Sequence, residues 1–298
     1  MKSPSRPLWQ GGWSTLWILA ASLAPADTPQ APPSEAVAGY WFDGAEINRY
    51  ELQQRCYGEL HPGHAVLVFV TEPFLVEEQV KRDFGQGQAV SVLKMNAMRD
   101  FLTGLYPYRT MTSVFQPVDQ KAALKVTTSV QEWCGHAFSQ SNRRTNGLKT
   151  EVHSYFQRAE RGQFTSPPDV LLEDELWTQL RLDPSALPTG SFEMVPGSLF
   201  LRLRHQDPAP HPAVGSWKES QQAGRSIYSL HYPDLGRSLE IEVETAFPYV
   251  IQAWEELEAG GKVFAQAQLT HRLEKQYYWS QNGLKDRSKR AKLGLPTE

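Results

Sequence analysis

A strict alternation of apolar and polar residues is the feature that most limits how this chain can fold. In residues 122–130, apolar and β-branched side chains occupy every second position, so they share one face of an extended strand. The same period of two recurs in residues 239–244 and 263–270. These runs are typical of long antiparallel strands with one face in contact with water. They predict a mainly β protein of the α+β class.

Three other segments extend this prediction. Residues 64–71 (HAVLVFVT) are apolar on both faces, so we expect a central strand or one whose second face is covered. Asn146-Gly147 separates two β-like segments, 134–141 and 148–156, which predicts a hairpin. The stretch 206–224 contains several prolines and few apolar residues, and we expect a loop there.

One segment has a helical period instead. Leu172, Leu176 and Leu180 recur at intervals of four residues, and the Pro-Pro-Asp sequence before them suits a helix start. This predicts one amphipathic helix within residues 168–182. A helix with an apolar stripe must bury it against a large apolar surface. We therefore expect a long curved antiparallel sheet, or half-barrel, wrapped around this helix.

The N-terminus has the layout of a secretory signal peptide, residues 1–26. Lys2 and Arg6 precede a short apolar run, 13–23, and small residues follow it. The run is too short to span a bilayer, so we expect its removal and no transmembrane segment in the mature protein. These features predict a periplasmic or secreted protein.

The remaining chain is expected to form one domain with two flexible ends. We predict a flexible linker at residues 27–39, a single β-rich domain at 40–281 and a basic flexible tail at 282–298. The formal net charge is -3 and the body has no basic stripe, so nucleic acid is not an expected partner. The chain has no glycine-rich phosphate loop and no Gly-x-Ser-x-Gly motif, and no cofactor is predicted.

The two cysteines are Cys56 and Cys134. In the oxidising compartment that the signal peptide implies, two thiols often form one disulfide, which would stabilise the fold by a few kcal/mol. We predict this bridge, with two unpaired thiols as the alternative.

The stretch Gln131–Gln140 (QEWCGHAFSQ) carries the main candidate site residues. If the strand at 122–130 continues unbroken, its core-facing side also carries Glu132, Cys134 and His136. One interpretation is a catalytic site in which Cys134 is the nucleophile, His136 its base and Glu132 the orienting group. A second is a metal site made by Cys134, His136 and His153 on the following strand.

The third interpretation of this stretch is structural, and it is the one that we predict. Cys134 then forms the disulfide or packs as a small apolar residue. Gly135 marks a bulge that turns His136 outward, and Glu132 pairs with an arginine of a neighbouring strand.

Several short motifs along the chain are considered together: Ala45–Ile47 with Tyr57–Glu59, Val68–Phe74, Gln79–Lys81, Tyr106–Tyr108, Gln131–His136 and Leu171–Leu176. Together they resemble a family of exported bacterial proteins of unknown function, some of which are labelled septum formation inhibitors. The resemblance implies a fold similar to that of periplasmic lipoprotein carriers, which are antiparallel half-barrels around a helix.

Three functional hypotheses follow. The first is a periplasmic protein that binds an apolar or lipid-like ligand, or a cell-envelope protein, in the concave face of its sheet. The second is a hydrolase or metal enzyme centred on Glu132, Cys134 and His136. The third is a structural component of the cell envelope.

Overall fold

The computed structural model describes residues 28–32, 34–85, 87–157 and 161–297. Within these residues the chain is mainly β, and sixteen strands form one long curved sheet that does not close on itself. The strand order is β10-β11-β12-β13-β14-β15-β16-β1-β2-β4-β5-β6-β7-β8-β9, and the short β3 pairs with β2 at the side. The fold class predicted from the alternation is confirmed, and the two halves of the chain share one continuous sheet.

The strands are β1 (Ala45–Cys56), β2 (Glu59–Leu75), β3 (Val80–Lys81), β4 (Ala89–Thr103), β5 (Tyr106–Pro117), β6 (Lys125–Glu132), β7 (Gly135–Arg144), β8 (Gly147–Ser154), β9 (Gly162–Ser166), β10 (Leu171–Leu172), β11 (Gly190–Val195), β12 (His211–Glu219), β13 (Arg225–Tyr232), β14 (Arg237–Glu244), β15 (Ile251–Glu258) and β16 (Lys262–Gln276). The helical segments are α1 (Ser34–Trp41), η1 (Glu173–Glu175), α2 (Leu176–Leu182), η2 (Pro184–Ala186), α3 (Ser198–Arg204), η3 (Tyr278–Ser280) and η4 (Leu284–Leu293), where η denotes a 3-10 helix.

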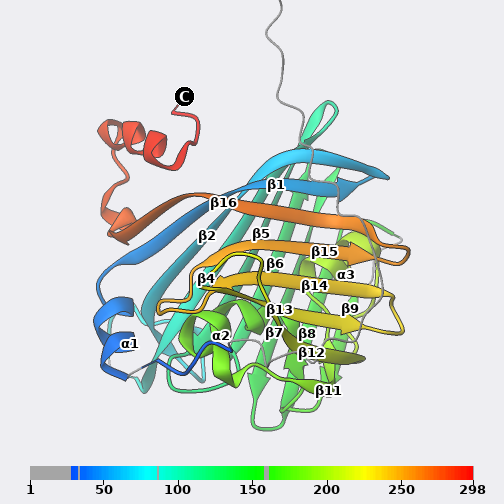
Figure 1. Ribbon diagram of the computed structural model, residues 1–298, viewed down its shortest axis with the longest axis horizontal. Coiled ribbons are helices and arrows are strands. Elements are labelled where there is room, and N and C mark those ends of the chain that lie inside the picture. The colour runs from blue at the N-terminus through cyan, green and yellow to red at the C-terminus, as the bar shows by residue number, and fades with distance from the viewer. Residues whose placement is uncertain (1–27, 33, 86, 158–160, 298) are drawn as a thin grey trace, which may run out of the picture.

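The sheet folds over so that β11–β16 face β4–β8, and α2 and α3 lie inside the fold (Figure 1). Helix α2 packs on β4 and β5, and its Trp177 meets Trp254 of β15 edge to face. Helix α3 packs on β5 and β6, and its Phe200 meets Phe264 of β16. Both helices therefore touch the two halves of the sheet at once.

The predicted helix at 168–182 is present, but it is shorter and more deeply buried than expected. A short strand, β10, and one 3-10 turn, η1, precede α2, which begins at Leu176. The apolar stripe, Leu172, Leu176 and Leu180, is buried as predicted. Every other side chain from Glu173 to Leu182 is buried as well, because sheet covers the segment on opposite sides. Its polar residues must therefore find partners inside the protein.

Buried ion pairs provide those partners. Glu173 pairs with Arg237 at the start of β14, and Glu175 pairs with Arg143 near the end of β7. At the other end of α2, Arg181 donates two hydrogen bonds, of 2.6 and 2.8 Å, to the carboxylate of Glu46 on β1. The helical segment is thus joined to three distant strands.

The strand faces follow the predicted alternation. Leu239, Ile241 and Val243 of β14 are buried, whereas the glutamates between them are partly exposed. The apolar second face of β2 is covered, as expected for residues 64–71, by Leu293 of η4, which packs against Val66 and Val68. The Asn146-Gly147 turn joins β7 and β8 in a hairpin, which confirms that prediction.

Three boundary predictions are wrong. Residues 34–39 of the predicted flexible linker belong to α1, which continues to Trp41 and buries that side chain against Phe69 in the core. Residues 284–293 of the predicted flexible tail form η4, because Leu293 packs on the outer face of β2. The predicted loop at 206–224 contains strand β12, whose Pro212 is placed near the strand start, where proline is tolerated.

The predicted signal peptide, residues 1–26, lies outside the described residues. Among the residues that are described, none of the helices has the length and apolar character that a membrane span requires.

The buried Arg237 allows a test of how strongly the ion pairs stabilise this fold. Arg237 also donates a 3.0 Å hydrogen bond to Glu256, and its guanidinium lies 4.4 Å from the ring centre of Phe200. We expect Arg237→Met to lower the free energy of unfolding by about 3–5 kcal/mol, because Glu173 is left buried without its cation. Urea unfolding at pH 7 measures this change.

The control for Arg237→Met is Lys218→Met, which removes one partner of the exposed pair with Glu240 and should cost less than about 1 kcal/mol. The double variant Arg237→Met with Glu173→Met should recover much of the lost stability, because neither charge is then left alone. Equal effects of Arg237→Met and Lys218→Met would contradict the assignment.

Candidate functional site

The candidate residues of Gln131–Gln140 do not share one strand face. Strand β6 ends at Glu132, residues 133 and 134 form a tight turn, and Gly135 begins β7 opposite Glu132. Glu132 is buried on the inner face, and its carboxylate accepts a 2.6 Å hydrogen bond from the backbone N–H of Cys134. The predictions of an arginine partner for Glu132 and of a bulge at Gly135 are therefore wrong. The chain reverses in a hairpin at this point, and the partner of Glu132 is the backbone of the turn.

Cys134 has the wrong environment for an activated nucleophile. It is exposed on the turn, and the neighbouring carboxylate of Glu132 raises the pKa of its thiol. Nucleophilic cysteines need a lowered pKa, which a cation or a base provides. His136 is exposed on β7, and no hydrogen bond joins it to Cys134 in the described part of the chain. The arrangement does not form the catalytic set of the second hypothesis.

His136 and His153 lie on the outer face of the sheet instead. They line an open groove of about 660 Å³ over β7 and β8, together with Phe138, Glu151 and Tyr155. Cys134 is not part of its lining. Among the residues described, no three or more His, Cys, Asp or Glu side chains are placed to hold a metal ion. The structure thus brings the two histidines into one groove, without the sulfur ligand that the sequence suggested.

The predicted disulfide is absent from the structure, in which both cysteines are free. Cys56 is buried at the end of β1 beside Phe101, Tyr108 and Leu199, and burial raises the pKa of its thiol. Cys134 is exposed on its turn. One thiol therefore faces the core and the other faces solvent, which corrects the expected bridge.

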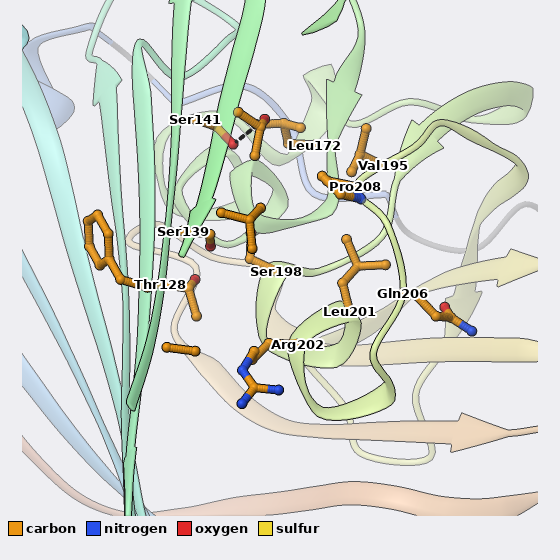
Figure 2. Close-up of a pocket in the computed structure, with 14 residues that line it drawn as sticks. Thr128, Ser139, Ser141, Leu172, Val195, Ser198, Leu201, Arg202, Gln206 and Pro208 are labelled. Atoms are coloured by element: carbon orange, nitrogen blue, oxygen red, sulfur yellow. Dashed lines mark hydrogen bonds between the residues drawn. The ribbon is translucent and has the colours of Figure 1, made fainter. Parts of the chain in front are cut away.

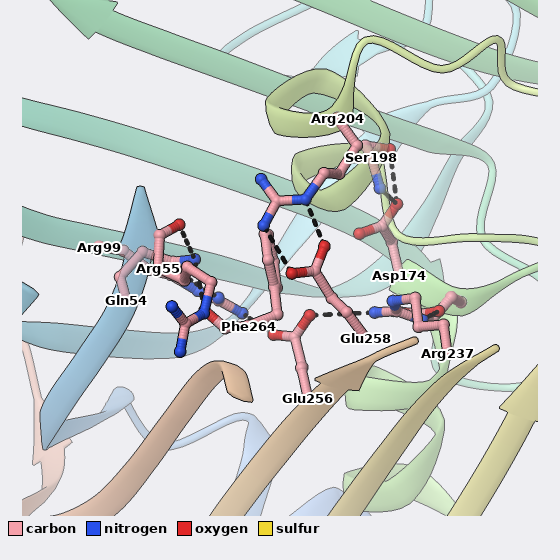
Figure 3. A network of polar contacts seen from close by, with 11 residues as sticks. Gln54, Arg55, Arg99, Asp174, Ser198, Arg204, Arg237, Glu256, Glu258 and Phe264 are labelled. Carbon is pink, nitrogen blue, oxygen red and sulfur yellow. Dashed lines mark hydrogen bonds and ion pairs between the residues drawn. The ribbon is translucent and has the colours of Figure 1, made fainter. Parts of the chain in front are cut away.

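The polar groups that occupy the centre of the fold belong to η1 and to the strands around it. Asp174 accepts hydrogen bonds of 3.0 Å from the backbone N–H of Ser198 and 2.6 Å from its hydroxyl, so it binds the start of α3 (Figure 3). Its two neighbours, Glu173 and Glu175, bind the two halves of the sheet through their arginines. Three consecutive acids thus connect α2, α3 and both layers.

This network continues across the concave face. Glu256 of β15 accepts a 2.8 Å hydrogen bond from Arg99 of β4 and the 3.0 Å bond from Arg237. Arg99 also donates a 2.9 Å hydrogen bond to Gln54 of β1. Nearer the surface, Arg204 at the end of α3 pairs with Glu258, and both side chains are partly exposed (Figure 3). Arg99, Arg237 and Arg204 thus each pair with a glutamate, which lowers the cost of burying these charges.

Two cavities flank α3, each of about 40 Å³. The first lies between α3 and strands β6–β8, where Ser198 and Leu201 form one wall and Thr128 and Ser139 belong to the other (Figure 2). The second lies on the opposite side of α3, between Phe200 and side chains of strands β4 and β15. Helix α3 is therefore the wall that the two cavities share.

Small hydroxyl side chains make the space beside α3. On the inner face, Thr112 hydrogen-bonds Thr128 at 2.9 Å across β5 and β6, and Ser141 hydrogen-bonds Thr150 at 2.8 Å across β7 and β8. These hydroxyls satisfy one another, so the surface behaves as a nearly apolar one. Because the side chains are short, they do not fill the distance to the helix.

Sequence reasoning missed both α3 and the acidic segment. Ser198–Arg204 is only seven residues long and follows a β-like segment, so its period carries little signal. The Glu-Asp-Glu run was visible in the motif Leu171–Leu176, just before the apolar stripe of the helix. Three acids in front of a buried helix are a signal for buried arginine partners, but the pattern does not say which arginines.

No protein-family model matches this chain, and neither a curated protein nor a solved structure matches it. The family resemblance drawn from the short motifs therefore stays a prediction.

The buried acids predict an unusual dependence of stability on pH. Burial raises the pKa of Asp174 to about 6 and that of Glu175 to about 7, against ordinary values of 3.8 and 4.5. Between about pH 4 and 7 these two side chains hold protons in the folded state that the unfolded chain releases, so their contribution to the free energy of unfolding falls as pH rises through this range. Urea unfolding at several pH values measures the slope.

Asp174→Asn should reduce this slope, because Asn keeps an acceptor for the N–H of Ser198 and does not titrate. The exposed Asp119→Asn is the control and should leave the slope unchanged. Glu46 acts in the opposite sense. Burial alone would raise its pKa, but Arg181 and Arg272 hold the pKa at about 2. The stability that Glu46 contributes is therefore lost only as pH falls below about 4.5. A stability that rises steadily from pH 4 to 7 would contradict these assignments.

The two thiols should react at very different rates. In the native protein, a maleimide should modify Cys134 alone, and Cys56 only after unfolding, because Cys56 is buried. Glu132→Gln should speed the reaction of Cys134 at pH 7.5, because removing the carboxylate lowers the thiol pKa. Cys134→Ser serves as the control and should leave no fast-reacting thiol. Failure of both native thiols to react would instead indicate a disulfide.

Proposed function

We propose that this protein is exported to the bacterial periplasm and that it binds an apolar or lipid-like ligand against the concave face of its sheet, beneath α3. Export rests on the signal-like sequence at residues 1–26. The ligand site rests on the two cavities that α3 separates, which is the observation that carries the proposal.

The cavities are too small for a ligand while α3 stays in place. Each of them, at about 40 Å³, has room for a few water molecules, whereas ligand pockets usually measure about 300–1,000 Å³. Displacement of α3 would join the two spaces along the inner faces of β4–β8. The proposal therefore requires α3 to act as a lid.

The contacts of the two helices suit different roles. Helix α2 is fixed by Arg181 to Glu46, and η1 before it is fixed by two further buried pairs. Helix α3 has weaker anchors: the hydrogen bonds of Ser198 with Asp174, worth about 1.5–3 kcal/mol, and the partly exposed Arg204–Glu258 pair, worth about 1 kcal/mol or less. Helix α2 is the fixed plug and α3 the movable part.

The exchange of α3 for a ligand is balanced in free energy. Exposing Leu199, Phe200 and Leu201 costs about 1.5–3 kcal/mol for each side chain. A buried acyl chain gains about 0.8 kcal/mol for each methylene, so roughly 6–11 methylenes offset this loss of apolar burial. A flexible chain also fits narrow spaces beside a helix better than the folded surface of an envelope protein does. A lipid-like ligand is therefore the occupant we favour.

Filling the first cavity should block the ligand. We expect Ser139→Phe, on the inner face of β7, to weaken binding of a fluorescent fatty-acid probe to delipidated protein by about tenfold or more, because the ring occupies the space beside α3. The matched control is Gln140→Phe, the next residue of the same strand, whose side chain lies on the other face. Fluorescence titration measures both affinities. If the unmodified protein does not bind the probe, or if both variants bind it equally, the proposed site is wrong.

A further inference from the structure

A row of exposed apolar side chains lies along one end of the sheet. The tips of the β1–β2, β4–β5 and β6–β7 hairpins and the end of β8 all meet at this end, because the strands between them are neighbours and antiparallel. We call this row the hairpin rim. Its members are Tyr57, Leu60, Leu102, Leu105, Trp133 and Tyr155.

The hairpin rim is both exposed and held in shape. Leu105 is 81% exposed, Tyr155 75% and Trp133 69%, which is unusual for side chains of this size. Tyr106 stacks on Trp133 with ring centres 6.2 Å apart, and its hydroxyl donates a 3.1 Å hydrogen bond to that of Tyr57. Contacts between hairpins thus fix the rings before anything binds, which lowers the entropy cost of binding.

Two of the three hairpin tips carry no charged side chain. Residues 102–108 of the β4–β5 hairpin carry no charge, and Asp100 and Arg109 flank them as a pair 3.6 Å apart. Residues 133–135 carry no charge either, whereas the β1–β2 tip carries Glu59 between Tyr57 and Leu60. At the β4–β5 tip, an apolar end followed by tyrosine hydroxyls and then by a charged pair reproduces the order of layers in a bilayer interface, from acyl chains to headgroups.

From this arrangement we propose that the hairpin rim inserts into the interface of a lipid bilayer. The rim projects as exposed ring and leucine tips, and those of the β4–β5 and β6–β7 hairpins carry no charge, which is the form that insertion into a bilayer interface requires. Tyr108 and Phe101, directly behind the rim, pack against Leu199 of α3. The rim thus places the lid of the proposed ligand site next to the membrane. A transfer of ligand between that site and the membrane rests on the proposed function.

Cys134 gives a direct probe of the rim, because it is exposed on the same turn as Trp133 and Cys56 is buried. An environment-sensitive dye on Cys134 of the full chain should shift its emission to shorter wavelength when vesicles of phosphatidylethanolamine and phosphatidylglycerol are added. Leu105→Ser in the labelled protein should require about tenfold more lipid for the same shift, because one apolar tip is lost.

The matched control carries Phe84→Cys in a Cys134→Ser background. Phe84 is 91% exposed, and it lies in the β2–β4 connection at the opposite end of the sheet, so a dye there should not shift. Equal shifts at positions 84 and 134, or no shift at 134, would overturn the proposal, the second result leaving a protein partner as the occupant of the rim.

Two variants separate this inference from the proposed function. Leu105→Ser should keep its uptake of the fatty-acid probe from solution, and Ser139→Phe should keep its vesicle-dependent dye shift. If the unmodified protein does not bind the fatty-acid probe, the ligand proposal is wrong and the proposal of membrane insertion is unaffected. If only the dye shift is absent, the proposal of membrane insertion is wrong and the ligand proposal is unaffected.

Discussion

The fold depends on the ion pairs that join the central helical segment to both halves of the sheet. A strand surface with one wet face could fold in many ways, but Glu173, Glu175 and Arg181 each require a particular partner once α2 is enclosed. Buried pairs of this kind contribute little net stability compared with apolar residues of the same shape. Their effect is to select one arrangement, because any other leaves a charge buried and unpaired.

The acidic segment η1 also accounts for the difference in how firmly α2 and α3 are anchored. The acids of η1 reach three different parts of the protein, and Asp174 is the one that holds α3. Its partner is the uncharged Ser198, whereas each of its neighbours is bonded to an arginine. A short helix with the weaker anchor, beside short hydroxyl side chains and two cavities, is the element that we propose as the lid.

The sequence was sufficient for the features that depend on exposure. Alternation reports which face of a strand meets water, so the β class, the buried faces of β14 and the covered second face of β2 could all be predicted. Leu176 and Leu180 likewise revealed a helix. The polar side of that helix could not be interpreted, because Glu173 and Arg237 lie 64 residues apart and only the folded sheet brings them together.

The candidate site shows where periodicity fails. Glu132 was correctly placed on the core side of its strand, but the strand ends there and Cys134 lies on the turn. Nothing in the residues before Gly135 marks that turn, so the pattern appeared to continue to His136. The tail was misjudged because Leu293 is one apolar anchor in a basic stretch, and composition averages it away.

Hydrogen–deuterium exchange tests the central claim most directly, because it reports the opening of each helix separately. A lid on a fixed plug predicts that the amides of α3 exchange much faster than those of α2 under native conditions, and that an apolar probe changes exchange in α3 and along the inner faces of β6–β8. Equal protection of the two helices, with exchange in α3 indifferent to the probe, would contradict the account.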